Sequence, residues 1–210
     1  MSLRNKSILL ILVILLIDQV LKFWIKTHMT IGDEFHIIGN WFIIHFTENN
    51  GMAFGMEFWG KSGKLLLSLF RIVAIVAIGY SIYQLIKQKA NTGLVLGISA
   101  ILAGAIGNLI DSAFYGILFN DSLAQLAQFL PAEGGYSSFL HGRVVDMLYF
   151  PIINTTYPNW IPWVGGKHFI FFSPVFNIAD SAITTGVFYL LIFQRKILLG
   201  KPDNKEQGVQ

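Results

Sequence analysis

The sequence predicts a membrane protein of the all-α class with a small β element, and three observations support this fold. Of its 210 residues, 54% are hydrophobic and only 13% are charged, whereas a soluble domain carries about 25% charged residues. Four apolar stretches reach the ~20 residues that a helix needs to cross a bilayer. Basic residues stand at the ends of these stretches. We therefore expect a single integral membrane domain over residues 1–210.

The four expected transmembrane helices cover about residues 7–26, 65–86, 93–119 and 171–193. Lysine or arginine precedes the first stretch, fills the turn between the second and third, and follows the fourth. These basic residues are Arg4, Lys6, Lys87, Lys89, Arg195, Lys196, Lys201 and Lys205. Because cytoplasmic loops are enriched in Lys and Arg, both termini are predicted to lie in the cytoplasm.

The first stretch has a second interpretation as a cleaved secretory signal peptide, because a short basic region precedes its apolar core. A signal peptide ends at a cleavage site of small residues. Here the charged and bulky run "DQVLKFWIK" follows instead. We therefore favour an uncleaved first span.

The two long segments between the spans are expected on the outer side of the membrane. Residues 30–60 contain "FHII" and "WFIIHFTE", which are β-branched and aromatic runs on either side of Gly39-Asn40. Such runs around a turn pair predict a β-hairpin. In the other outer segment, the run "DSLAQLAQFL" at 121–130 predicts a short amphipathic helix.

Polar side chains interrupt the apolar stretches at helical spacing. They form three pairs, Asp18 with Lys22, Asn108 with Asp111, and Asn177 with Asp180. This spacing puts both members of a pair on one helix face, and a rise of ~1.5 Å per residue puts all three pairs in the outer half of their spans. Asp146 lies in the outer segment that leads back to the fourth span. Because a charge in the bilayer costs about 2.5–3.5 kcal/mol, polar residues at one level indicate a functional site.

Structural roles are the alternative for several of these residues. The first pair can be an ion pair or a tie between the helix end and the outer hairpin, and the second pair can form hydrogen bonds between helices. Arg143 lies three residues before Asp146 and can neutralise it. A structural role explains Asp180 less well, because a second carboxylate at the same level adds repulsion.

Two carboxylates at one membrane level suit more than one kind of chemistry. Neighbouring carboxylates share a proton, so one can take a proton from water while the other donates to a carbonyl, as in aspartic proteases. Proton-coupled transport and a divalent cation site are alternatives. Since the chain has no cysteine and no HExxH-like spacing of its five histidines, we expect neither a thiolate nucleophile nor a zinc site. The net charge of +3, without a basic patch, argues against nucleic-acid binding.

Five short motifs resemble, in order, those of the bacterial lipoprotein signal peptidases, also called signal peptidase II. They are "DQVLK" at 18–22, "NNGMAFG" at 49–55, "GNLIDS" at 107–112, "GRVVDM" at 142–147 and "FNIADS" at 176–181. Each motif alone is weakly specific, but together they span nearly the whole membrane part. The resemblance implies four membrane helices with cytoplasmic ends, a periplasmic β-cradle, and an active site at the periplasmic side of the bacterial inner membrane.

The resemblance also implies a reaction and its residues. The family removes the signal peptide from prolipoproteins that carry a diacylglyceryl group, cutting just before the lipidated cysteine, and cyclic peptides of the globomycin type inhibit it. No metal or other cofactor is implied, and contacts with membrane lipids are expected. Asp146 and Asp180 match the catalytic pair. The supporting or substrate-binding positions are matched by Asn49, Gly51, Asn108, Asp111, Asn177, Asp18 and Lys22.

The sequence departs from the family pattern in two places. Ser112 stands where the third-helix motif usually ends in Arg, and we expect Arg143 to supply the charge that contacts the substrate instead. In addition, the stretch between Asp111 and Asp146 is longer than in most family members. We expect the insert at about 116–141 to form an extra periplasmic lid or rim.

Two other functions are the alternatives to a peptidase. A small proton- or cation-coupled transporter would line a path through the bilayer with carboxylates, but the inner halves of the expected spans are nearly free of ionisable groups. A non-catalytic membrane adaptor would use its polar residues only to hold helices together. Cleavage of a purified diacylglyceryl prolipoprotein distinguishes the peptidase from both.

Overall fold

The computed structural model describes residues 1–50, 60–171 and 174–198. The chain forms two compact units. The first unit consists of Met1–Gln19, Leu66–Ile110 and Ile178–Gln210, and the second of Val20–Leu65 and Asp111–Asn177. Helices α1 (Leu3–His28) and α2 (Gly60–Lys87) each contribute residues to both units.

Three helices among the described residues are long and apolar enough to cross a membrane. They cover Leu3–His28, Ser62–Lys87 and Thr92–Leu118, close to the first three predicted spans. The last of them combines α3 (Thr92–Ile110), a π-helical turn (Asp111–Tyr115) and the short α4 (Gly116–Leu118). The prediction of a mainly helical chain with long apolar helices is confirmed.

The fourth apolar stretch differs from its prediction at its amino-terminal end. Helix α5 covers only Ile178–Phe193, and the short α6 (Arg195–Leu198) follows after one residue. The helix cannot begin near residue 171, because Pro174 lacks a backbone N–H and is incompatible with a helix interior. The preceding residues form strands instead, β5 (His168–Phe171) and β6 (Val175–Phe176). At 16 residues, α5 is shorter than the other apolar helices, so the count of four spans stays a prediction.

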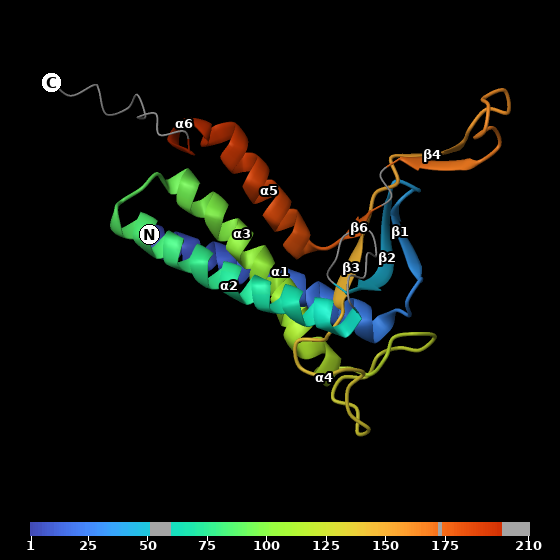
Figure 1. The fold of residues 1–210 in the computed structure, drawn as a ribbon, viewed down its shortest axis with the longest axis horizontal. Coiled ribbons are helices and arrows are strands. Elements are labelled where there is room, and N and C mark those ends of the chain that lie inside the picture. The colour runs from blue at the N-terminus through green and yellow to red at the C-terminus, as the bar shows by residue number, and fades with distance from the viewer. Residues whose placement is uncertain (51–59, 172–173, 199–210) are drawn as a thin grey trace. The chain divides into compact units, whose positions relative to one another are not determined.

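Small residues let α5 pack closely against α3 within the first unit (Figure 1). A Cβ atom at Gly104 would lie 2.2 Å from the carbonyl oxygen of Ala179, and one at Gly186 would lie 2.9 Å from that of Gly97. Close approach at small residues is a common way for helices to associate in lipid. The contact holds the first turn of α5 against α3.

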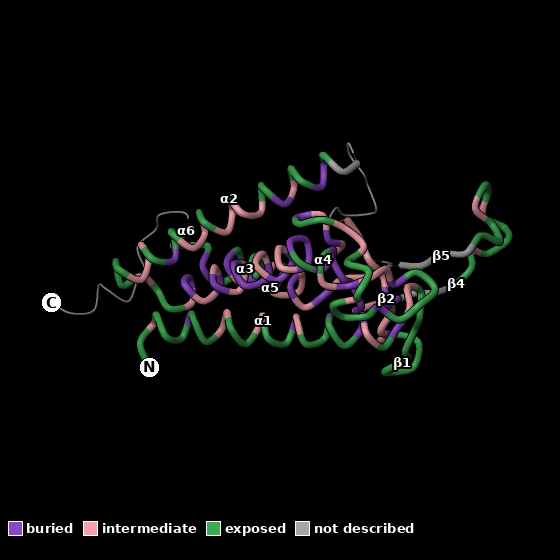
Figure 2. The backbone as a smooth tube through the Cα atoms, turned by 90° about the horizontal axis from the view of Figure 1, so that it is seen from below, coloured by how far each residue is buried: buried purple, intermediate pink, exposed green. Residues whose placement is uncertain are grey.

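Burial differs between the helices, as Figure 2 shows. Half of the residues in the apolar 18-residue core of Thr92–Leu118 are buried, compared with 17% of those in Leu3–His28 and 11% of those in Ser62–Lys87. The exposed surfaces of α1 and α2 are largely apolar. An exposed apolar helix face suits contact with lipid rather than water.

The second unit is built on a four-stranded antiparallel sheet with the order β1-β2-β3-β6. Besides β6, the sheet contains β1 (Glu34–Ile38), β2 (Phe42–Asn49) and β3 (Val144–Tyr149). The predicted hairpin is confirmed, because β1 pairs with β2 across a turn in which Gly39 has a φ of 51°. The rest of the predicted β region, residues 51–59, lies outside the described residues. A separate hairpin joins β4 (Ile153–Thr156) to β5.

The helix predicted at 121–130 is wrong, because the chain there forms turns and irregular structure. One reason is local: the carboxylate of Asp121 accepts the backbone N–H of Leu123 at 2.8 Å, and such bonds compete with helix formation. Another is tertiary: the N–H of Ala127 donates to the carbonyl of Lys26 at 3.0 Å. The insert is therefore tied to the end of α1.

Replacing Gly104 by alanine is expected to destabilise the protein. The added methyl group would meet the carbonyl oxygen of Ala179, and overpacking of this kind typically costs about 1–3 kcal/mol. Gly79→Ala in α2 is the matched control, since a Cβ there meets no described atom within 4 Å. The thermal unfolding midpoint of Gly104→Ala in detergent should fall below that of Gly79→Ala. Equal midpoints would contradict the close contact between α3 and α5.

Candidate active site

Asp146 lies in the middle of β3 in the second unit and is only 3% exposed. The amide of Asn49, at the end of β2, donates to Oδ2 of Asp146. The amide of Asn177, which follows β6, donates to Oδ1 at 2.7 Å. Two neutral donors from distant parts of the chain therefore fix the orientation of this carboxylate.

Asn177 also forms a hydrogen bond with the backbone of β3 in the same unit. Its Nδ2 also donates to the carbonyl oxygen of Val145 at 3.2 Å, and the residue is fully buried. It directly precedes α5, the position where asparagine is favoured at the start of a helix. The contact therefore ties the chain entering α5 to β3.

Lys22 and Asp111 form a fully buried ion pair. Nζ lies 2.8 Å from Oδ2, and both side chains are 0% exposed. The same Oδ2 accepts the backbone N–H of Val145 at 3.3 Å. Since removing one partner of a buried pair typically costs about 3–5 kcal/mol, this contact holds β3 against the end of α1 and the π-helical turn.

Asp180 lies in the first turn of α5 in the first unit, where the helix dipole favours a negative charge. Nδ2 of Asn108 on α3 donates to its Oδ1 at 2.7 Å. Asp18 on α1 accepts the backbone N–H of Ala179 at 2.9 Å and so satisfies one of the free donors at the helix start. Gly107 leaves room for Asp18, because a Cβ there would lie 2.7 Å from Oδ2.

The structure groups the residues predicted for the site according to unit. In the second unit, Asn49 and Asn177 donate hydrogen bonds to Asp146 on β3. Asp111 accepts a hydrogen bond from the backbone of β3 and forms an ion pair with Lys22. In the first unit, the start of α5 is held by contacts that involve Asp180, Asn108 and Asp18. Gly51 lies outside the described residues. The catalytic and substrate-binding roles of these residues stay predictions.

Arg143 has partners that the sequence did not suggest. Its Nη1 lies 3.0 Å from Oε2 of Glu48, and its Nη2 lies 2.5 Å from Oδ2 of Asp121. The sequence raised two roles for this guanidinium, neutralising Asp146 or contacting the substrate. Its ion pairs connect β2 with the insert, and its contact with the substrate stays a prediction.

Lys26 and Glu48 are buried ionisable residues that the sequence analysis missed. Their side chains are 0% and 1% exposed, and they form an ion pair. One signal was available, because Asp18, Lys22 and Lys26 recur every four residues along α1 and therefore share one helix face. Charges that recur on one face of an apolar helix indicate buried partners.

Comparisons with known proteins cover nearly the whole chain. The family model for signal peptidase (SPase) II matches residues 10–195. A protein of Porphyromonas gingivalis named lipoprotein signal peptidase is 50% identical over 184 residues, which are 87% of this chain and 80% of the relative. A protein of the same name from Amoebophilus asiaticus is 36% identical over 202 residues, which are 95% of this chain and 81% of the relative.

A solved structure described as a bacterial membrane enzyme is similar as well. It is 27% identical in sequence, with a TM-score of 0.60, and the match covers 95% of this chain and 93% of that one. These similarities confirm the resemblance seen in the five motifs and give no support to the transporter alternative. With its long apolar helices, the chain is a multi-pass membrane protease, and it belongs to the signal peptidase II family.

Proposed function

We propose that this protein is an aspartic endopeptidase that removes the signal peptide from diacylglyceryl-modified prolipoproteins, just before the lipidated cysteine, with Asp146 and Asp180 as catalytic residues. The family and the relatives named lipoprotein signal peptidase support the reaction. One observation carries the residue assignment: an asparagine amide holds each carboxylate. Asn177 donates to Asp146 at 2.7 Å, and Asn108 donates to Asp180 at 2.7 Å.

An amide donor suits a carboxylate that must gain and lose a proton. It orients the oxygens without adding a net charge, whereas a nearby lysine or arginine strongly favours the ionised form. Asp111 lies 2.8 Å from the ammonium of Lys22, in an ion pair that ties the π-helical turn to α1. The amide donors at Asp146 and Asp180 therefore support a catalytic role for these two carboxylates, and the buried ion pair supports a structural role for Asp111.

In the proposed reaction, one carboxylate is ionised and the other is protonated. The ionised group takes a proton from water as the water oxygen attacks the carbonyl carbon before the lipidated cysteine, and the protonated group gives its proton to the carbonyl oxygen. In the second step, the first group gives its proton to the leaving nitrogen as the C–N bond breaks, and the other group takes a proton from the tetrahedral diol. Both groups thereby return to their starting states.

The other residues predicted for the site are proposed to support this pair and the substrate. They are Asn49, Gly51, Asn108, Asp111, Asn177, Arg143, Asp18 and Lys22. Membrane lipids are proposed to surround the apolar helices, and cyclic peptides of the globomycin type are proposed to inhibit the enzyme.

We also propose that α5 forms a fourth span, with both termini in the cytoplasm and the reaction at the periplasmic face of the bacterial inner membrane. The basic residues at Arg4, Lys6, Lys87 and Lys89 support this orientation. The 16 residues of α5 extend about 24 Å, which is less than the ~30 Å of the hydrocarbon core. Asp180, in the first turn, would then lie near one end of the span, where water can reach it.

Replacing either proposed catalytic residue by asparagine should abolish cleavage. Asp146→Asn and Asp180→Asn keep the size of the side chain but remove the group that exchanges a proton, and loss of general acid–base catalysis lowers rates by about 10²–10⁴-fold. Cleavage of a purified diacylglyceryl prolipoprotein, followed by gel shift, measures the effect.

Asp33→Asn provides the matched control for these variants. Asp33 is exposed and accepts the backbone N–H of Thr30 at 2.7 Å in the turn before β1, a contact that asparagine can replace. All three variants should fold and insert, and only the control should retain activity. Substantial cleavage by Asp146→Asn or Asp180→Asn would contradict the assignment.

Arg143→Ala should reduce cleavage far more than Lys167→Ala. The first change leaves the carboxylates of Glu48 and Asp121 without the guanidinium that lies between them. Lys167 is exposed in the hairpin that joins β4 to β5, so its removal tests the loss of a positive charge alone. The same gel assay applies, and equal, mild effects would show that Arg143 has no role in the reaction.

A further inference from the structure

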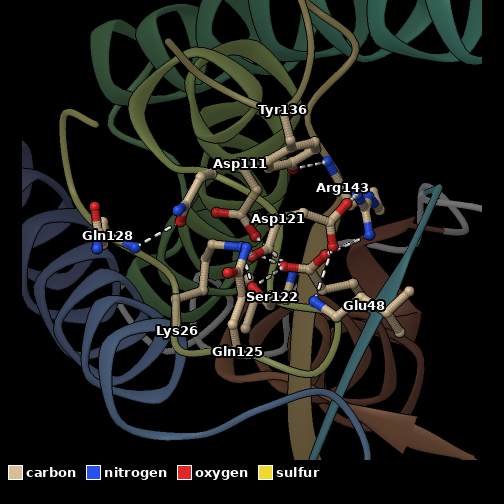
Figure 3. Close-up of polar contacts among 12 residues, drawn as sticks. Lys26, Glu48, Asp111, Asp121, Ser122, Gln125, Gln128, Tyr136 and Arg143 are labelled. Atoms are coloured by element: carbon tan, nitrogen blue, oxygen red, sulfur yellow. Dashed lines mark hydrogen bonds and ion pairs between the residues drawn. The ribbon is translucent and has the colours of Figure 1, made fainter. Parts of the chain in front are cut away.

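The second unit contains a group of charged and polar side chains that take no proton in the proposed reaction. It consists of Lys26, Glu48, Asp121, Ser122, Tyr136 and Arg143, and we call it the Lys26 cluster (Figure 3). Lys26 belongs to α1 and Glu48 to β2, while the other members lie between α4 and β3. The cluster therefore joins three parts of the chain that are distant in the sequence.

Lys26 and Glu48 form the buried centre of the cluster. Nζ of Lys26 donates to Oε1 of Glu48 and, at 2.9 Å, to the hydroxyl of Ser122. The ammonium also lies 5.3 Å from the ring centroid of Phe119 and 5.2 Å from that of Tyr136, within the range of cation–π attraction. Because an unpaired buried charge is very unfavourable, each of these two residues depends on the other.

Arg143 extends the cluster towards the surface, with a side chain that is 27% exposed. Its guanidinium lies between Glu48 and Asp121 and 4.4 Å from the ring centroid of Tyr136. The contact with Glu48 is a charge pair rather than an aligned hydrogen bond, since Oε2 has no hydrogen-bond partner among the described residues. The backbone N–H of Arg143 donates to the hydroxyl of Tyr136 at 2.6 Å.

These contacts shift the pKa values of Asp121, Tyr136 and Arg143. Burial acts to raise the pKa of Asp121, but hydrogen bonds from Arg143 and the N–H of Leu123 outweigh it and hold the pKa below its ordinary value. Burial, aided by the charge of Glu48, raises the pKa of Tyr136, so its phenol stays protonated. Burial acts to lower the pKa of Arg143, but its acidic partners raise it overall. The cluster thus balances two basic against two acidic side chains.

The cluster lies beside the proposed catalytic carboxylate along both strands. Glu48 directly precedes Asn49, whose amide donates to Asp146, and it pairs with Val145 in the register of β2 and β3. Arg143 directly precedes β3, three residues before Asp146. A slip of one residue turns every side chain of a strand to the opposite face. The ion pairs of Glu48 and Arg143 therefore lie at the ends of the two strands whose register sets the orientation of Asp146.

We infer that the Lys26 cluster positions Asp146 for catalysis by holding the end of β2 and the start of β3 in the register that lets Asn49 donate to it. The inference rests on the proposed function. Glu48 and Arg143 are positioning residues that act through the two strands and not by touching the substrate. The insert then stabilises β3, because it supplies Asp121, one of the two acidic partners of Arg143.

Glu48→Gln is the main test, because it keeps the size of the side chain and removes the charge between Lys26 and Arg143. We expect kcat for cleavage of a diacylglyceryl prolipoprotein to fall by about tenfold or more, since a misplacement of ~1 Å can cost 10²-fold. KM should change by less than about twofold, because substrate binding is not affected. Glu34→Gln on β1 is the matched control, since that carboxylate is 42% exposed, and it should keep wild-type values.

Hydrogen–deuterium exchange of the purified full-length protein gives a readout that does not depend on cleavage. The amides of Val144–Tyr149 should exchange faster in Glu48→Gln than in the wild type or in Glu34→Gln. A raised KM with unchanged exchange would mean that the cluster contacts the substrate, and it would overturn the inference, as would an unchanged kcat. A wild-type protein that does not cleave would contradict the proposed function instead, whatever the exchange pattern.

A double variant tests whether the charges act as a pair. Lys26→Met combined with Glu48→Gln removes one cation and one anion together, and neutral groups in place of a buried pair cost less than one charge left alone. Both kcat and the slow exchange of Val144–Tyr149 should recover partly towards wild type. This variant also carries the test if Glu48→Gln does not fold. A double variant no better than Glu48→Gln in both readouts would overturn the inference.

Discussion

The fold depends on the requirement that charges buried in an apolar chain find their partners within that chain. A buried charge without a partner shifts to its neutral form or destabilises the fold. Lys22 and Asp111 meet this requirement for the end of the third apolar helix, with 2.8 Å between Nζ and Oδ2. Because Oδ2 of Asp111 also accepts the N–H of Val145, the same ion pair fixes the strand that carries Asp146.

One face of α1 provides this pairing over three successive turns. Asp18 accepts a backbone N–H at the start of α5, Lys22 pairs with Asp111, and Lys26 pairs with Glu48. All three side chains of α1 are 0% exposed, although the helix as a whole is one of the most exposed in the molecule. A helix that faces lipid on most of its surface thus serves as a fixed support along a single stripe.

The sequence predicted the helices and the hairpin, which depend on local patterns of residues. It did not predict the contacts between residues that are distant in the chain. Hydropathy located three long helices, and the turn pair at Gly39-Asn40 located the hairpin. Two predictions failed because a single residue or a tertiary contact determines the local structure. Pro174 delays the start of α5, and side-chain and backbone hydrogen bonds keep residues 121–130 from forming a helix. Glu48 gave no signal at all, because its partners lie far away in the chain.

The long insert can be accommodated without moving the site because its two ends touch each other. The N–H of Gly142 donates to the carbonyl oxygen of Ser112 at 2.8 Å, so the chain leaves and returns at one place. Only glycine fits there, since a Cβ would lie 2.2 Å from the carbonyl oxygen of Asp111. Each doubling of a loop whose ends are held together costs only about 0.6 kcal/mol of closure entropy. The distance along the chain between Asp111 and Asp146 can therefore grow while the bond from Val145 to Asp111 is kept.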